Sequence, residues 1–246
     1  MLPKNNPMLT IEHLSASVEK KKILHDISYS FVPGKTYAIL GPNGSGKSTL
    51  ASVIMGHPNF TLSRASKLLW NGKNIKNFSP DKRALLGLSM TFQNPLTLTG
   101  VSVRDLLRVA LEKKYDVIVM YQKIQIAAQA LHIKEELLSR SLHDGFSGGE
   151  KKKLEALQIA LLEPNFVLFD EIDTGVDVDA LKTITLFLKK SLPQQSTRVF
   201  ITHSAKLLKY MQPDSVLVMK DGRLVATGDK ELAAHIERSG FNTLPE

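Results

Sequence analysis

The residues with the clearest chemical potential lie in one glycine-rich stretch, GPNGSGKST. The stretch matches the pattern G-x-x-x-x-G-K-S/T without a mismatch, between a predicted strand and a predicted helix. Glycines allow backbone N–H groups to turn inward around phosphate oxygens. We expect Lys47 to reach the β and γ phosphates of a nucleotide and the Ser48 hydroxyl to bind Mg²⁺. The predicted nucleotide site consists of Gly41, Pro42, Asn43, Gly44, Ser45, Gly46, Lys47, Ser48 and Thr49.

A second stretch, FVLFDE, ends an apolar strand with two acids, Asp170 and Glu171. Open α/β sheets bind ligands at the carboxyl ends of their strands. We expect Asp170 to hold Mg²⁺ through water and Glu171 to polarise a water that attacks the γ phosphate. Gln93 would contact the metal and this water, and His203 would bind the γ phosphate and orient Glu171. Each of these residues alone is as typical of a strand that ends in solvent, so the prediction depends on their combination with the glycine-rich loop.

A third stretch, HDGFSGGEKKKLEAL, places Ser147, Gly148 and Gly149 before a predicted helix whose first turn carries Lys151–Lys153. Helix N-termini have a partial positive charge and free N–H donors, so lysines are unusual there unless an anion docks nearby. One chain has little use for two phosphate cradles. Two chains arranged head to tail would use both, each closing its Ser-Gly-Gly over the nucleotide of the other.

The three lysines are open to two interpretations. In the first, one of them pairs with Glu171 in the free monomer and holds it away from the water until a dimer closes. In the second, which is the commoner arrangement, Lys151–Lys153 form a solvated basic turn.

Composition limits the function classes. The 246 residues carry a formal net charge of +8 and no cysteine, which excludes disulfides, cysteine catalysis and a cysteine-ligated cluster on this chain. No apolar run approaches the ~18–20 residues of a membrane helix, and the N-terminus lacks the pattern of a signal peptide. The basic residues are dispersed and not interleaved with aromatics, which argues against nucleic-acid binding. We expect a cytoplasmic protein without direct membrane insertion.

The elements that must position these residues alternate along the chain. Apolar and polar residues alternate in 8–18 and 23–34, which predicts antiparallel strands, and an Asn-Gly turn predicts a hairpin in 67–75. Residues 103–162 have mostly helical spacing, with one possible strand at 115–120. Buried strands and helices alternate again from 165 onward, which predicts an α/β core with a largely parallel sheet. We expect a single domain, 1–246, with a helical subdomain at about 95–162.

The order of the motifs resembles the ATP-binding-cassette (ABC) ATPases. The matching stretches are GPNGSGKST, TFQNP, FSGGE, FVLFDE, TGVD and ITH, which together span nearly the whole chain. The resemblance implies an ABC nucleotide-binding domain with a P-loop parallel-sheet core, an N-terminal antiparallel β subdomain and a helical subdomain. It implies ATP and Mg²⁺ as cofactors, a transient ATP-dependent homodimer, and a loop at Thr174–Asp177 that crosses the dimer interface. The aromatic that usually stacks on adenine is missing near Val18.

Three stretches are similar to one group of that family, the SufC proteins, which are the ATPases of the Suf iron–sulfur cluster assembly system. They are TFQNPLTLTGVSVRDLL, FSGGEKKKLEALQIALLEPNFVLFDEIDTGVDVDALK and GDKELAAHIERSGF. The resemblance implies SufB- and SufD-like scaffold partners, which would bind between Gln93 and about Arg108 unless that apolar segment packs within the protein. Leu98-Thr99-Gly100 and the lone Phe241 depart from the SufC pattern.

Two other functions remain open. Most ABC ATPases drive membrane transporters, so the subunit of an importer or exporter is the main alternative. A DNA-linked ABC ATPase is the other, but the helical insert is too short for the long coiled coil that such proteins usually carry.

Overall fold

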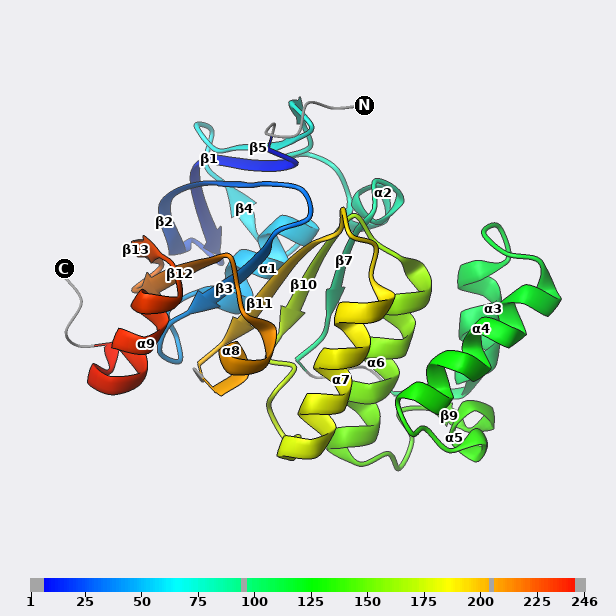
Figure 1. The fold of residues 1–246 in the computed structure, drawn as a ribbon. Helices are drawn as coiled ribbons and strands as arrows, with labels where there is room; N and C mark the ends of the chain where they lie inside the picture. The colour runs from blue at the N-terminus through cyan, green and yellow to red at the C-terminus, as the bar shows by residue number, and fades with distance from the viewer. Residues whose placement is uncertain (1–6, 94–96, 204–205, 242–246) are drawn as a thin grey trace. The chain divides into compact units, whose positions relative to one another are not determined.

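The computed structural model describes residues 7–93, 97–203 and 206–241 and divides into two compact units (Figure 1). The core unit comprises Met1–Met90, Asn165–Glu171 and Pro193–Glu246. The helical unit comprises Thr91–Pro164 and Ile172–Leu192, so it takes in a helix beyond the expected 95–162. That helix, α7 (Val178–Ser191), packs on α6 (Gly148–Leu162), which explains why it groups with this unit.

The core unit is built around a six-stranded sheet. Its strand order is β13-β12-β3-β11-β10-β7, and β12, β3, β11 and β10 pair in parallel, as the alternating sequence predicts. The strands are β3 (Thr36–Leu40), β7 (Leu88–Thr91), β10 (Phe166–Asp170), β11 (Thr197–Thr202), β12 (Ser215–Lys220) and β13 (Arg223–Gly228). The apolar stretch LLGLSMTFQNP also predicts a strand that Pro95 ends, but Pro95 lies outside the described residues.

Helices of the core unit pack on both faces of this sheet. Tyr37 and Ile39 of β3 join one apolar cluster with α1 (Lys47–Met55), whereas Ala38 and Leu40 join another with α8 (Lys206–Met211) and α9 (Lys230–Ser239). This alternation follows from the pleat of a strand, which sends successive side chains to opposite faces.

The predicted N-terminal strands form a second, antiparallel sheet in the order β2-β1-β5-β6, with β4 paired to β1. Its strands are β1 (Leu9–Val18), β2 (Lys21–Phe31), β4 (Thr61–Leu62), β5 (Lys67–Trp70) and β6 (Lys73–Asn74). Leu9, Phe31 and Trp70 belong to the same apolar cluster as α1, so this sheet and the helix share one core.

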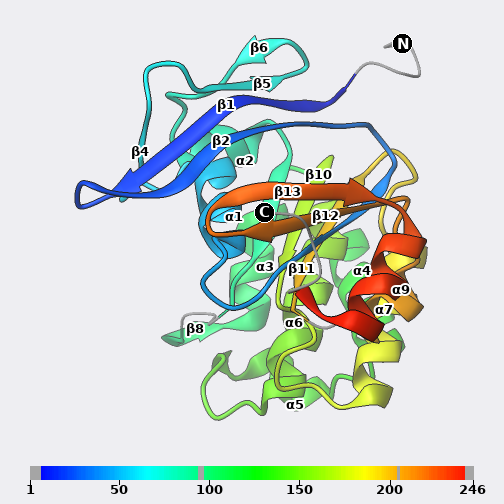
Figure 2. The same ribbon diagram turned by 90° about the vertical axis from the view of Figure 1, so that its left-hand side faces the viewer.

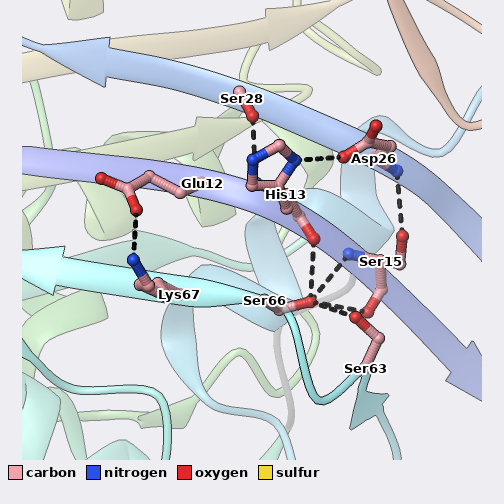
Figure 3. A network of polar contacts seen from close by, with 8 residues as sticks. All are labelled: Glu12, His13, Ser15, Asp26, Ser28, Ser63, Ser66 and Lys67. Atoms are coloured by element: carbon pink, nitrogen blue, oxygen red, sulfur yellow. Dashed lines mark hydrogen bonds and ion pairs between the residues drawn. The ribbon is translucent and has the colours of Figure 1, made fainter.

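A network of hydroxyl groups fixes the irregular part of this second sheet (Figure 3). His13 and Asp26 both have positive φ where the β1–β2 register shifts, and the His13 Nδ1 atom lies 2.9 Å from Asp26 Oδ1. Ser66 donates to the His13 carbonyl and accepts from the Ser15 N–H. Ser28 Oγ accepts from the His13 backbone N–H at 2.9 Å, not from its ring, so the residues of Figure 3 form a structural network rather than a catalytic triad.

The helical unit contains five helices and one short strand pair within the described residues. The predicted strand at 115–120 is wrong, because the Asp116 side chain accepts from the Ile118 N–H and caps a helix there. The pairing of β8 with β9 was not predicted, since a two-residue strand carries no sequence pattern. The elements besides α6 and α7 are β8 (Leu98–Ser102), α3 (Val103–Leu111), α4 (Val117–Ala130), α5 (Glu135–Ser139) and β9 (Ser141–Leu142).

A buried arginine holds the C-terminal end of α1 in the core unit. Arg83, on the short helix α2 (Pro80–Leu85), is 1% exposed and donates to the carbonyls of Val53 and Ile54 at 2.8 and 2.7 Å. It also donates to the carbonyls of Lys76 and Phe78. The cation thus satisfies carbonyls at the end of a helix where the dipole is negative.

We predict that Arg83→Met lowers the free energy of unfolding by about 3 kcal/mol, because buried carbonyls lose a charged donor. Urea titration of the purified chain measures this. Lys82→Met, an exposed change on the same helix, is the control. Equal midpoints for the two variants would contradict the role assigned to Arg83.

Candidate functional site

The glycine-rich loop connects β3 to α1, as its sequence context predicts. Gly44 and Gly46 have φ of 80° and 96°, in the left-handed region that glycine occupies without strain. A Cβ atom at Gly41 would lie 2.3 Å from the Met219 carbonyl oxygen, so no larger residue fits there. The loop is therefore shaped by backbone conformations and close approaches that only glycine permits.

Lys47 begins α1 and turns back over the loop. Its Nζ atom donates to the carbonyl oxygens of Gly41 at 2.8 Å and Pro42 at 2.9 Å, and the residue is 5% exposed. Burial lowers the pKa of Lys47, while the charges of Glu171 and Asp170 act in the opposite direction. The ammonium group is thus held at the mouth of the loop, close to two carboxylates.

Ser48 and Asp170 meet at the end of the central strands. The Ser48 hydroxyl donates to Asp170 Oδ1 at 3.1 Å, and Asp170 is 4% exposed as the last residue of β10. A hydroxyl and a carboxylate side by side are the hard oxygen ligands that suit Mg²⁺, which usually takes its other ligands from water and substrate phosphates. The residues present therefore fit the expected metal.

Glu171 follows directly and has an unusual backbone. Its φ is 50°, in a region that costs a non-glycine residue roughly 1 kcal/mol or more, and its N–H donates to the Ile201 carbonyl of β11 at 2.9 Å. The His203 Nδ1 atom lies 3.5 Å from Glu171 Oε1, with the imidazole about half exposed. The structure thus brings Lys47, Ser48, Asp170, Glu171 and His203 together in the core unit.

The other predicted site residues, Gln93 and Ser147 to Gly149, belong to the helical unit. Ser147 is the N-cap of α6, and its hydroxyl oxygen accepts from the Glu150 N–H at 3.3 Å. Glu150 Oε2 accepts from the Ser147 N–H at 2.8 Å, which completes a capping box. Sequence reasoning missed this role of Glu150, although the spacing S-x-x-E predicts it.

The two glycines of this motif have different surroundings. A Cβ atom at Gly148 would lie 2.8 Å from the Gly175 carbonyl oxygen, so the motif packs tightly on the loop Thr174–Asp177. At Gly149 a Cβ atom would meet no atom of the described chain within 4 Å. Packing within this chain therefore explains a glycine at 148 and leaves the one at 149 unexplained.

A buried ion pair follows the capping box on α6. Lys152 and Glu155 are each 5% exposed, with Lys152 Nζ 3.0 Å from Glu155 Oε2. Lys152 donates to the Phe92 carbonyl at 3.0 Å, and Glu155 accepts from the Phe92 N–H at 2.8 Å. The prediction of a solvated basic turn is thus wrong for Lys152, which is buried. Its ammonium group holds the Phe92 carbonyl, directly before Gln93, in place. A pairing between one of the lysines and Glu171 stays a prediction.

His143 lies shortly before Ser147, and its imidazole is buried in the neutral form. Burial, and then the charges of Lys151 and Lys152, lower the pKa of His143 to about 4. The unfolded chain has the ordinary pKa of 6.5, so between these values it binds more protons than the folded chain. His143 therefore favours folding above about pH 6.5, and this contribution is lost as the pH falls toward 4.

We predict that the free energy of unfolding of the natural chain falls by up to about 3 kcal/mol through this pH window because of His143. His143→Asn should remove that part of the pH dependence, since asparagine tolerates the positive φ of 60°. His132→Asn is the matched control, because His132 also has a positive φ, of 53°, but is exposed. The prediction fails if both variants keep the natural pH dependence in denaturant titrations.

Comparison with known proteins gives the family. A sequence model described as ABC transporter matches residues 24–174. A probable ABC transporter ATP-binding protein of Streptococcus pyogenes serotype M3 is 41% identical, over 95% of this chain and 93% of that protein. A probable ATP-dependent transporter of Synechocystis sp. is also 41% identical, over 97% and 96% of the two chains. The chain belongs to the ABC transporter family and is an ATP-binding ATPase subunit.

Solved structures agree on the fold. The ADP conformation of an ATP-binding cassette of an ABC transporter aligns with a TM-score of 0.74 and 24% identity, over 96% of each chain. An ATP-bound bacterial Atm1-family exporter has a TM-score of 0.79 at 20% identity, over 98% of this chain and 41% of that one. Within the described residues, none of the helices has the length and apolar composition of a membrane span.

Proposed function

We propose that this chain is the ATP-hydrolysing subunit of a cytoplasmic iron–sulfur cluster assembly complex with SufB- and SufD-like scaffold partners. The observation that carries the proposal is the resemblance of residues 146–182 to SufC. Some residues of this stretch have defined structural roles in the helical unit. Glu150 completes the capping box, and Lys152 with Glu155 fixes the Phe92 backbone.

In the proposed ATP site, Lys47 leaves the loop carbonyls and binds the β and γ phosphates, while inward N–H groups of Gly41–Thr49 hold their oxygens. Ser48 and Asp170 would hold Mg²⁺, with Gln93 as a further contact. When bound, the metal neutralises charge on the phosphates. Glu171 accepts a hydrogen bond from the attacking water, and His203 orients the Glu171 carboxylate.

The proposed site is completed by a second copy of the chain. Ser147, Gly148 and Gly149 of that copy would supply N–H donors at a helix N-terminus, which suits a γ phosphate. The open space at Gly149 supports this arrangement, since a close approach by another molecule explains a glycine that packing within the chain does not. ATP would then favour a transient head-to-tail dimer.

A second candidate function is the ATPase subunit of a membrane transporter. It is favoured by the names of the relatives, which are called transporters or transporter ATP-binding proteins. Both candidates use the same ATP site and differ only in the subunit that ATP hydrolysis moves. The partner therefore distinguishes them.

The proposed partner surface includes exposed apolar side chains. Phe92, Leu98 and Val101 are 60%, 40% and 37% exposed, within or next to the segment from Gln93 to Arg108. The described chain leaves a substantial part of each side chain uncovered, which supports a role in binding another subunit.

The test is a pulldown of the tagged chain from its host after detergent extraction, with all co-purifying proteins identified. We expect soluble partners with clusters of cysteine and histidine. The double variant Leu98→Glu, Val101→Glu should lose them and keep basal ATPase activity, whereas the matched control Ile118→Glu, on the exposed side of α4, should keep them. An integral-membrane permease in place of these partners would reject the assembly role and establish the transporter role.

A further inference from the structure

The turn of the last hairpin lies against the glycine-rich loop of the core unit. This turn, Asp221-Gly222, joins β12 to β13, and β13 runs beside β2 (Figure 2). The Gly222 N–H donates to the Ser45 carbonyl oxygen at 3.0 Å. The Gly222 carbonyl oxygen accepts from the His25 N–H at 2.8 Å. Two successive backbone hydrogen bonds thus connect β2, the hairpin turn and the loop.

No side chain fits at Gly222. A Cβ atom there would lie 1.9 Å from the Ile23 carbonyl oxygen and 2.8 Å from His25 Cδ2, and the residue has a φ of 72°. Any other residue must therefore move the turn away from β2, and with it the donor that reaches Ser45.

The bond from Gly222 also sets the direction of an amide in the loop. The Ser45 carbonyl and the Gly46 N–H belong to one trans peptide plane, so they point in opposite directions. Ser45 is 2% exposed, and its carbonyl needs a donor from the protein. Holding that carbonyl toward Gly222 turns the Gly46 N–H to the other side, where it meets no acceptor in the described part of the chain.

We propose that Gly222 is a positioning residue of the phosphate-binding loop, which presets the Gly46 N–H for a phosphate oxygen by holding the Ser45 carbonyl outward. The inference rests on the proposed role of Gly41–Thr49 as the phosphate site. Gly222 acts through the loop and does not itself contact the nucleotide. A loop preset in this way binds phosphate without first reorganising.

The first test compares Gly222→Ala with Gly72→Ala. Gly72 has a φ of 81° in the Asn71-Gly72 hairpin turn, but a Cβ atom there would meet nothing within 4 Å. Alanine at position 72 therefore has the same backbone strain as alanine at position 222 but no steric clash. We expect Gly222→Ala to weaken binding of a fluorescent ATP analogue about ten-fold or more, and Gly72→Ala to change it less than about two-fold. The affinities of both variants are measured under conditions in which circular dichroism shows that each variant is folded. Equal affinities would overturn the proposal.

The second test needs no variant, so it decides the question even if Gly222→Ala does not fold. In the natural chain carrying isotopically labelled glycine, hydrogen exchange of single amides is measured with and without MgATP. We expect nucleotide to slow exchange at Gly222 and Gly46 and leave Gly72 unchanged. An effect at Gly46 without one at Gly222 would reject only the positioning role. No binding and no effect at any glycine of the loop would reject the proposed ATP site itself.

Discussion

Glu171→Gln is expected to lower the turnover number for ATP by roughly 10²–10⁴-fold and to leave ATP affinity nearly unchanged. Glutamine keeps the size and hydrogen-bonding oxygen of the side chain but cannot take a proton from water. The carboxylate lies beside His203 at 3.5 Å and follows the Asp170 that meets Ser48, so it is well placed to act at the phosphate end of a nucleotide. Phosphate release and equilibrium binding of a fluorescent ATP analogue measure the two quantities.

The control for this variant is Glu163→Gln. Glu163 also has a φ of 50°, so glutamine meets the same backbone conformation, but its carboxylate pairs with Lys114 and Lys123 in the helical unit. We expect normal turnover for it. If Glu171→Gln turned over as fast as Glu163→Gln, Glu171 would not be the catalytic carboxylate.

Lys47→Met is expected to weaken ATP binding at least about a hundred-fold, because removal of one partner of a buried charged contact costs ~2–5 kcal/mol. The ammonium donates to the Gly41 and Pro42 carbonyls, and burial lowers its pKa. It is therefore a buried cation held by two loop carbonyls and, at 3.5 Å, by the Ser45 hydroxyl, and the oxygens of a phosphate chain would be stronger partners for it. Isothermal titration with ATP measures the affinity.

Lys35→Met provides the comparison for Lys47→Met. Lys35 lies one element upstream, and its Nζ atom pairs with Asp214 at 2.8 Å on the surface, where the side chain is 52% exposed. Exposed pairs contribute about 1 kcal/mol or less, so we expect little change in stability and none in ATP affinity. Retention of natural affinity by Lys47→Met would contradict the placement of the phosphates at this loop.

Much of the core could be predicted because its signals are local. The loop Gly41–Thr49 between a strand and a helix, and the apolar strand that ends in Asp170, follow from residue types and spacing alone. The mistaken strand at 115–120 shows the limit of such signals. The apolar residues there suit a strand as well as a helix. The hydrogen bond from the Ile118 N–H to the Asp116 side chain caps the first turn and favours the helix.

The sequence by itself determined the family and the parallel α/β core, and it predicts the residues of the ATP site, because each depends on spacing along the chain. Only the tertiary structure decided that Lys152 and Glu155 form hydrogen bonds with the Phe92 backbone, and that the Gly222 N–H donates to the Ser45 carbonyl. These contacts join residues far apart in sequence through backbone groups, which carry no residue-specific pattern. Their pairing follows from packing and from the need to satisfy every buried polar group, and both are properties of the folded chain.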